Sequence, residues 1–134
     1  MAKAKLKNDK TQASVQDFLK SIKDDQQRKD SIAIVSMMEK AAGEPPKMWG
    51  AAIVGFGDVY LKYESGRELD WFRIGFSPRK QNLTLYGLLG RDVSADLFKK
   101  LGKYKTTGGC LYVKKLEDID QSVFEKILKI KFAK

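Results

Sequence analysis

The fold is decided by residues 48–86, MWGAAIVGFGDVYLKYESGRELDWFRIGFSPRKQNLTLY. Short apolar or alternating runs are separated here by glycines and polar turns, a pattern typical of β-strands with tight connections. It predicts strands over 51–56, 59–63, 71–76 and 83–86, with turns at 65–68 and 77–81. Because the connections are short, we expect these strands to form an antiparallel meander.

Helical patterns precede this stretch. Ser14 begins a pattern that resembles a capping box, and apolar residues follow it at helical spacing. A second helical period covers 32–38, and Gly43 with Pro45-Pro46 predicts its end. Polar residues at 24–27 separate the two helical patterns.

Helical and strand patterns also follow the meander. Ser94 is suited to cap a helix that Gly102 stops, residues 110–114 alternate as a fifth strand, and Asp120 caps a last helix. Helices before and after a block of strands predict an α+β fold. We expect an antiparallel sheet of about five strands, with the helices packed on one face.

Length and composition are those of one domain. The chain has 134 residues, of which 43% are hydrophobic, enough for one core. We expect a mobile basic tail over 1–12 and a single domain over 13–134. The beginning of the chain does not resemble a signal peptide, no stretch is apolar enough to span a bilayer, and Cys110 is the single cysteine. These features favour a cytoplasmic protein without a membrane partner.

The absence of histidine narrows the chemistry. It removes the usual general base, the usual zinc ligand and every Ser-His or Cys-His pair. Cys110 has no base partner that the sequence identifies, and a mid-strand cysteine is more often an inert packing residue. We therefore expect a binding protein and not an enzyme, with no cofactor.

The charge balance favours anionic partners. There are 26 Lys plus Arg against 17 Asp plus Glu, a formal net charge of +9. Such a surface attracts nucleic acid, acidic lipid and phosphorylated metabolites alike, and the charge alone does not choose among them.

One sheet face is expected to be aromatic and basic. If Phe72, Ile74 and the apolar residues of 110–114 face the helices, alternation turns their neighbours to the other face. Aromatic rings there would stack on flat ligands, and cations would pair with phosphates or carboxylates. A loop, the N-terminal segment or a second subunit are alternative covers for this face, so a homodimer or another protein partner stays open.

Two basic turns are expected to flank that face, at 77–80 and 103–109. Glycines let backbone N–H groups approach an anion, and Lys or Arg adds charge. The candidate ligand-binding residues are Trp49, Trp71, Arg73, Arg79, Lys80, Lys103, Lys105, Tyr112 and Lys114. Nucleic-acid binding by stacking on the same face is the alternative for this surface.

Carboxylates near the first helices give a weaker candidate. Asp17, Asp24, Asp25 and Asp30 offer oxygen ligands of the kind that hard cations prefer, but lysines and arginines are interleaved with them. A metal site there is an alternative and not the leading interpretation.

A series of motifs also resembles a known family, the bacterial YdhG-like family, a domain of unknown function. The motifs occur in order over about residues 14–130. They are Met48-Trp49-Gly50, Ile53-Val54-Gly55-Phe56-Gly57, Tyr63-Glu64-Ser65-Gly66-Arg67-Glu68, Asp70-Trp71-Phe72, Gly75-Phe76-Ser77-Pro78-Arg79-Lys80, Leu83-Thr84-Leu85-Tyr86, Leu101-Gly102-Lys103 and Cys110-Leu111-Tyr112-Val113-Lys114.

The resemblance implies a frataxin-like α+β fold, with an antiparallel sheet and helices on one side. One branch of the family is described as a frataxin-like iron chaperone for iron–sulfur or haem assembly. Three hypotheses result: a binding domain for an anionic or flat small ligand, an iron chaperone using Asp24, Asp25 and Glu39, and a single-stranded nucleic-acid-binding protein.

Overall fold

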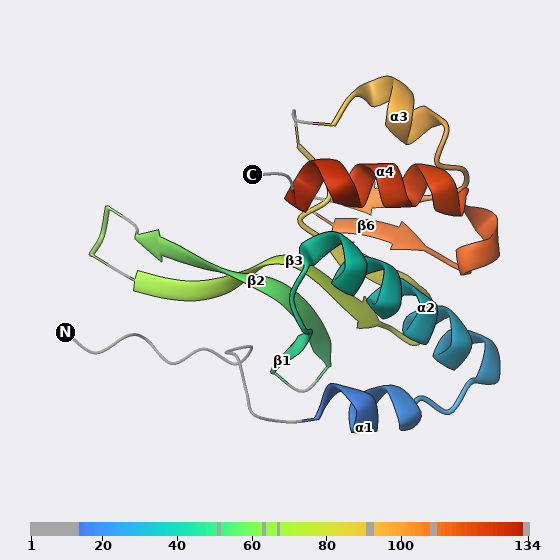
Figure 1. Cartoon of the computed structure of the whole chain (residues 1–134), viewed down its shortest axis with the longest axis horizontal. Helices are drawn as coiled ribbons and strands as arrows, with labels where there is room; N and C mark the ends of the chain where they lie inside the picture. The colour runs from blue at the N-terminus through green and yellow to red at the C-terminus, as the bar shows by residue number, and fades with distance from the viewer. Residues whose placement is uncertain are drawn as a thin grey trace.

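In the computed structural model, a helical layer lies against one face of an antiparallel sheet (Figure 1). The structure describes residues 14–50, 52–62, 64–66, 68–90, 93–107 and 110–132, with the side chains of 58–62 and 68–71 excepted. The expected tail at 1–12 lies outside these residues. The α+β class with an antiparallel sheet is confirmed.

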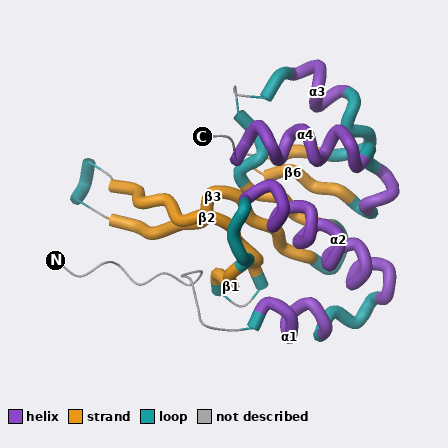
Figure 2. Tube along the Cα trace, viewed as in Figure 1, coloured by secondary structure: helices purple, strands orange, loops and turns teal. Residues whose placement is uncertain are grey.

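Within the described residues, the strands form one six-stranded sheet in the order β1-β2-β3-β4-β6-β5, and every neighbouring pair is antiparallel. The strands are β1 (Lys47–Trp49), β2 (Ile53–Lys62), β3 (Glu68–Pro78), β4 (Leu83–Tyr86), β5 (Lys105–Thr107) and β6 (Cys110–Val113). The helices are α1 (Val15–Lys20), α2 (Asp25–Ala42), α3 (Ala95–Lys99), the 3₁₀ turn η1 (Leu116–Asp118) and α4 (Gln121–Phe132). Figure 2 shows β3 and β6 passing behind α2 and α4, while the β2–β3 hairpin extends beyond the helices on the left of the view.

The sheet differs from the expectation at three places. Strand β1 was not predicted, and β5 lies where a loop was expected. The two strands predicted over 51–56 and 59–63 are the single strand β2, because the chain continues through Gly57 without turning back. Gly57 has a φ of 78°, a left-handed value that glycine adopts without steric cost.

Side-chain caps define the helix ends. Ser14 Oγ accepts a hydrogen bond from Asp17 N at 3.1 Å, and Ser94 Oγ accepts one from Leu97 N at 3.2 Å, as their capping patterns predicted. The Asp24 carboxylate accepts from Gln27 N at 2.7 Å, so the polar stretch after α1 is the beginning of α2. Gly43 ends α2 in the left-handed conformation, with a φ of 72°.

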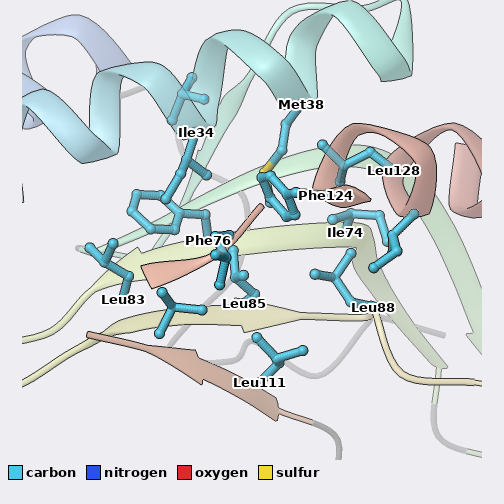
Figure 3. Close-up of a cluster of buried hydrophobic side chains, with 14 of the residues drawn as sticks. Ile34, Met38, Ile74, Phe76, Leu83, Leu85, Leu88, Leu111, Phe124 and Leu128 are labelled. Atoms are coloured by element: carbon cyan, nitrogen blue, oxygen red, sulfur yellow. The ribbon is translucent and has the colours of Figure 1, made fainter. Parts of the chain in front are cut away.

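The main core lies between the sheet and the helices α2 and α4. Ile34 and Met38 of α2, Phe124 of α4, and Ile74 and Phe76 of β3 are buried together there (Figure 3). Leu83, Leu85, Leu111 and Val113 extend this core across β4 and β6. Burial of these apolar side chains supplies most of the driving force for packing the two layers.

A second cluster occupies the opposite sheet face. Trp49, Ile53 and Phe72 are buried together, and half-buried Tyr86 packs against them. The prediction that Phe72 and Ile74 share the helix-covered face is therefore wrong. Alternation along β3 breaks between these two residues, opposite Gly57, where a Cβ would lie 3.1 Å from Arg73 Cβ. The register is one-to-one on both sides of this point, Phe56 with Ile74 and Asp58 with Phe72, so no residue is inserted. The break coincides with the left-handed φ of 78° at Gly57.

None of the described helices has both the length and the apolarity needed to cross a membrane.

Candidate functional site

The sheet face away from the helices carries polar and aromatic side chains on β4 and β6. Leu83, Leu85, Leu111 and Val113 point into the main core, so alternation turns Thr84, Tyr86, Cys110 and Tyr112 to the other face. The register joins them in cross-strand pairs, Thr84 with Tyr112 and Tyr86 with Cys110. These four residues form the floor on which the candidate site is built.

Two adjoining pockets lie over this floor and at its β5 edge. The larger has a volume of about 910 Å³ and the smaller about 500 Å³. They share Lys80, Gln81, Asn82 and Tyr112, so we treat them as one feature, the basic groove. The remaining lining of the larger part is Gly102, Lys103, Tyr104, Lys105, Lys114 and Asp118, and that of the smaller part is Arg79, Thr84, Tyr86 and Cys110.

The turn after β3 supplies one wall of the groove. Arg79 N donates to Asn82 O at 2.8 Å and closes the turn. Gln27 Nε2 of α2 donates to Arg79 O at 2.5 Å, and Arg79 Nη2 donates to Tyr86 Oη at 2.8 Å. Three hydrogen bonds thus fix both the backbone and the guanidinium of Arg79, although the residue is exposed.

The segment around Gly102 supplies the facing wall. Lys103 N donates to Asp118 O at 3.0 Å, and Asp120 N donates to Leu101 O at 2.7 Å. Gly102 has a φ of 122°, and a Cβ at this position would collide with Asp118 O. The close approach requires glycine, and it holds Lys103 at the groove beside Lys105, whose register partner is Tyr112.

Positive charge dominates the groove. Lys80, Lys103, Lys105 and Lys114 line its larger part, and Asp118 is the single carboxylate among the lining residues that the structure describes there. All four lysines are exposed: Lys105 lies in β5, Lys114 directly follows β6, and Lys80 and Lys103 lie in connecting segments. A concave surface lined by one sign of charge concentrates ions of the other sign.

Tyr112 lies where the two parts of the groove meet. Partial burial, followed by the neighbouring Cys110 and Tyr86, raises the pKa of its phenol above the ordinary 10.0. A group whose pKa is raised in this way stays protonated at neutral pH. Tyr112 therefore presents an uncharged ring and a hydroxyl donor, and it does not repel an anion.

Six of the nine predicted ligand-binding residues line the groove: Arg79, Lys80, Lys103, Lys105, Tyr112 and Lys114. The two basic turns do converge, as their positions beside one sheet face suggested.

Trp49 lies in the second cluster and not in the groove. It is 1% exposed, and its ring centroid lies 5.6 Å from that of Phe72 in an edge-to-face contact. Gly55 and Gly75 make room for these two rings against the sheet, since a Cβ at either position would overlap one of them. The buried ring of Trp49 offers no face for a ligand to stack on.

Arg73 lies on the other side of the sheet from its predicted position. Its guanidinium is 5.9 Å from the ring centroid of Phe132 in α4, on the helix side. The break in alternation opposite Gly57 explains the change of face. The side chain of Trp71 lies outside the described residues, although its backbone pairs with Val59.

The alternative metal ligands do not converge. Asp24 caps α2, and Asp25 pairs with Arg28 in the next turn. Glu39 lies in the same helix fourteen residues after Asp25, about 21 Å away at 1.5 Å per residue. Within the described ranges, no group of three or more His, Cys, Asp or Glu side chains is arranged to hold a metal ion.

Several residues of the groove were not identified from the sequence. Tyr86, Thr84 and Asn82 line it, and Gln27 anchors it from a helix 52 positions earlier in the chain. Alternation over 83–86 would have placed Thr84 and Tyr86 opposite the leucines. No local signal pointed to Gln27, because its partner is a backbone carbonyl.

Comparison of this chain with protein-family models, with curated proteins and with solved structures finds no match.

Proposed function

We propose that this chain is a small binding domain that holds an anionic small molecule in the basic groove. One observation carries the proposal: two basic segments, distant in sequence, meet over Tyr112 and place Lys80, Lys103, Lys105 and Lys114 around one concavity. Charge-assisted hydrogen bonds to phosphate or carboxylate are about twice as strong as neutral ones. Several lysines acting together favour a ligand with more than one negative charge.

The backbone of the groove is held in place, and this distinguishes the groove from a generic basic surface. Arg79 and Lys103 are both held by hydrogen bonds to distant segments, and Gly102 permits the contact at Asp118. Preorganised donors lose less conformational freedom when a ligand binds.

Charge reversal tests the proposal. We expect Lys103→Glu with Lys105→Glu, and separately Arg79→Glu with Lys80→Glu, to abolish binding of inorganic tripolyphosphate and citrate in calorimetry. The matched control is Lys29→Glu with Lys129→Glu, which makes the same change in net charge at exposed positions of α2 and α4. An equal loss of affinity in the control would show that the effect comes from net charge and not from the groove. Unchanged affinity in the groove variants would refute the proposed site.

Single-stranded nucleic acid is the second candidate, because Tyr86, Tyr104 and Tyr112 lie among the cations of the groove. Base stacking on aromatic rings beside a basic groove is the usual mode of such binding. A steep loss of RNA affinity with salt, from release of counterions, is the expected signature.

A thermal-shift screen separates these candidates from the iron hypothesis. A ligand at about 100 times its dissociation constant stabilises the fold by about 2.7 kcal/mol. Stabilisation by tripolyphosphate supports the proposal, and stabilisation by RNA alone supports the second candidate. A shift with ferrous iron alone would replace both with an iron chaperone.

We also propose membership of the YdhG-like family, a cytoplasmic location and a non-catalytic role. An antiparallel sheet with helices on one face is what that resemblance implies, and it supports the assignment. A sequence without histidine, the usual general acid–base residue, favours binding over acid–base chemistry.

A further inference from the structure

The two parts of the basic groove differ in chemistry. Lys103, Lys105 and Lys114 line only the larger part. The smaller part has Thr84, Tyr86 and Cys110 in place of these lysines. It shares Lys80 with the larger part, and its other cation, Arg79, is hydrogen bonded to Tyr86 Oη at 2.8 Å. A ligand that matches both parts has more of its negative charge at the end near Lys103, Lys105 and Lys114.

Amide and hydroxyl groups lie where the two parts adjoin: Gln81 and Asn82 line both parts, and Thr84 lines the smaller one. Thr84 Oγ1 donates to Asn82 Oδ1 at 2.8 Å, which leaves the amide nitrogen of Asn82 as a donor for another partner. Gln81 lies beside it with a second amide. Such groups recognise the ring nitrogens and carbonyls at the edge of a heterocycle.

Tyr112 joins the two parts, since it lines both. Its ring is half-buried and uncharged, and its register partners are Thr84 on one side and Lys105 on the other. A flat group placed over this ring would have amides at its edge and lysines beyond it.

The smaller part of the groove borders the second cluster. Tyr86 lines the groove, and its ring packs against Phe72 with centroids 5.7 Å apart. The polar lining of the groove therefore meets an apolar neighbour on this side.

We propose that the basic groove binds a nucleoside polyphosphate, with the phosphates between Lys103, Lys105 and Lys114 and the base over Tyr112 beside Asn82. The inference rests on the proposed function and names the ligand class for that same site. Volumes of about 910 and 500 Å³ for the two parts lie in the range of small-molecule sites.

Calorimetry on the full chain with four probes tests the ligand class: adenosine triphosphate, inorganic tripolyphosphate, adenosine and a single-stranded adenylate octamer. Stacking of a base on an aromatic ring contributes about 1–3 kcal/mol, so the nucleotide is expected to bind at least about fivefold tighter than tripolyphosphate. Adenosine alone is expected to bind more weakly than either, because it lacks the charged end.

The outcomes separate this inference from the proposed function. Equal affinities for the nucleotide and tripolyphosphate would overturn the nucleoside assignment and leave anion binding intact. Binding of neither would overturn both. An octamer that binds more than tenfold tighter than the nucleotide would overturn the small-ligand assignment in favour of a polymer.

Variants of Tyr112 locate the base. Tyr112→Phe keeps the ring and is expected to preserve the preference for the nucleotide over tripolyphosphate, whereas Tyr112→Ala is expected to reduce that preference to about one. A preserved preference in a folded Tyr112→Ala protein would overturn the placement. If Tyr112→Ala does not fold, Tyr112→Leu decides, because leucine keeps an apolar side chain at this position but removes the aromatic face. A preserved preference for the nucleotide in a folded Tyr112→Leu protein would overturn the placement of the base.

Discussion

Gly75 shows at the scale of one residue why the second cluster needs glycine. The ring of Phe72 lies over it, and a Cβ at Gly75 would be 2.5 Å from Phe72 Cε1. We expect Gly75→Ala to reduce the free energy of unfolding by about 1–3 kcal/mol, the usual cost of overpacking a core. Urea denaturation followed by circular dichroism measures it.

A double-mutant cycle isolates the cause of that loss. In a Phe72→Ala background the ring is gone, so the same Gly75→Ala substitution should cost much less than in the wild type. An equal cost in both backgrounds would show that the penalty arises from the backbone at Gly75 and not from the ring.

At the scale of one residue, Asp120 also makes the stability of the folded state depend on pH. Its carboxylate accepts from Ser122 Oγ at 2.7 Å, Ser122 N at 2.9 Å and Val123 N at 3.2 Å, and these bonds, the Ser122 hydroxyl first, lower its pKa from the ordinary 3.8. Because the pKa is lower in the folded state, the stabilisation is fully present above the unfolded pKa of about 3.9 and is lost as pH falls through the folded value.

Asp120→Asn tests this dependence, because asparagine also caps helices but does not titrate. We expect the wild type to be more stable than the variant by a constant amount above about pH 5, and this difference to shrink below about pH 4. Denaturation midpoints between pH 2.5 and pH 7 measure it. Parallel pH profiles for the two proteins would show that Asp120 does not contribute this dependence.

At the scale of elements, the sequence predicts the features that depend on local signals, such as the ends of helices. Ser14, Gly43, Ser94 and Asp120 lie at helix ends as expected, because caps depend on residues within one turn. Strand β5 was not predicted: its three exposed residues lack an apolar pattern, and pairing with β6 alone makes them a strand. Two of the three residues are threonines, which favour strands, but a run of three without an apolar pattern is too short to predict from sequence.

Some residues of the candidate site are likewise predictable from local sequence, and others depend on the geometry of the strands. Lys103 and Lys105 were predicted because basic residues near glycine are visible in the sequence, and their convergence with Lys80 followed from placing both turns beside one face. Arg73 was misplaced, since strict alternation assumes an unbroken strand and the break opposite Gly57 reverses it. A positive φ at one glycine cannot be distinguished by pattern from an ordinary glycine in a strand.

At the scale of the whole molecule, the two layers meet again at the groove. The helical layer reaches the turn after β3 through one side chain, Gln27, whose amide donates to Arg79 O at 2.5 Å. The wall of the groove is thus positioned by α2, which itself packs on the sheet through Ile34 and Met38. Affinity in the groove should therefore depend on a residue that does not line it.

Removal of that link is expected to change affinity without changing the charges that bind. A neutral hydrogen bond contributes about 0.5–1.5 kcal/mol, so Gln27→Ala should weaken tripolyphosphate binding by about two- to tenfold. The slope of log affinity against log salt should stay that of the wild type, because no cation is lost, whereas Lys103→Gln, which removes one cation, should reduce it. Calorimetry at 50 and 200 mM salt gives both quantities.

The control for this measurement is Gln16→Ala, an equivalent truncation at an exposed position of α1. Unchanged affinity in Gln27→Ala would mean that the other two hydrogen bonds of Arg79, to Asn82 O and to Tyr86 Oη, suffice to hold the turn in position. A changed salt slope would mean that Gln27 acts on the number of cations engaged and not on their placement. Weaker affinity with an unchanged slope is therefore the result that identifies Gln27 as a positioning residue acting between the layers.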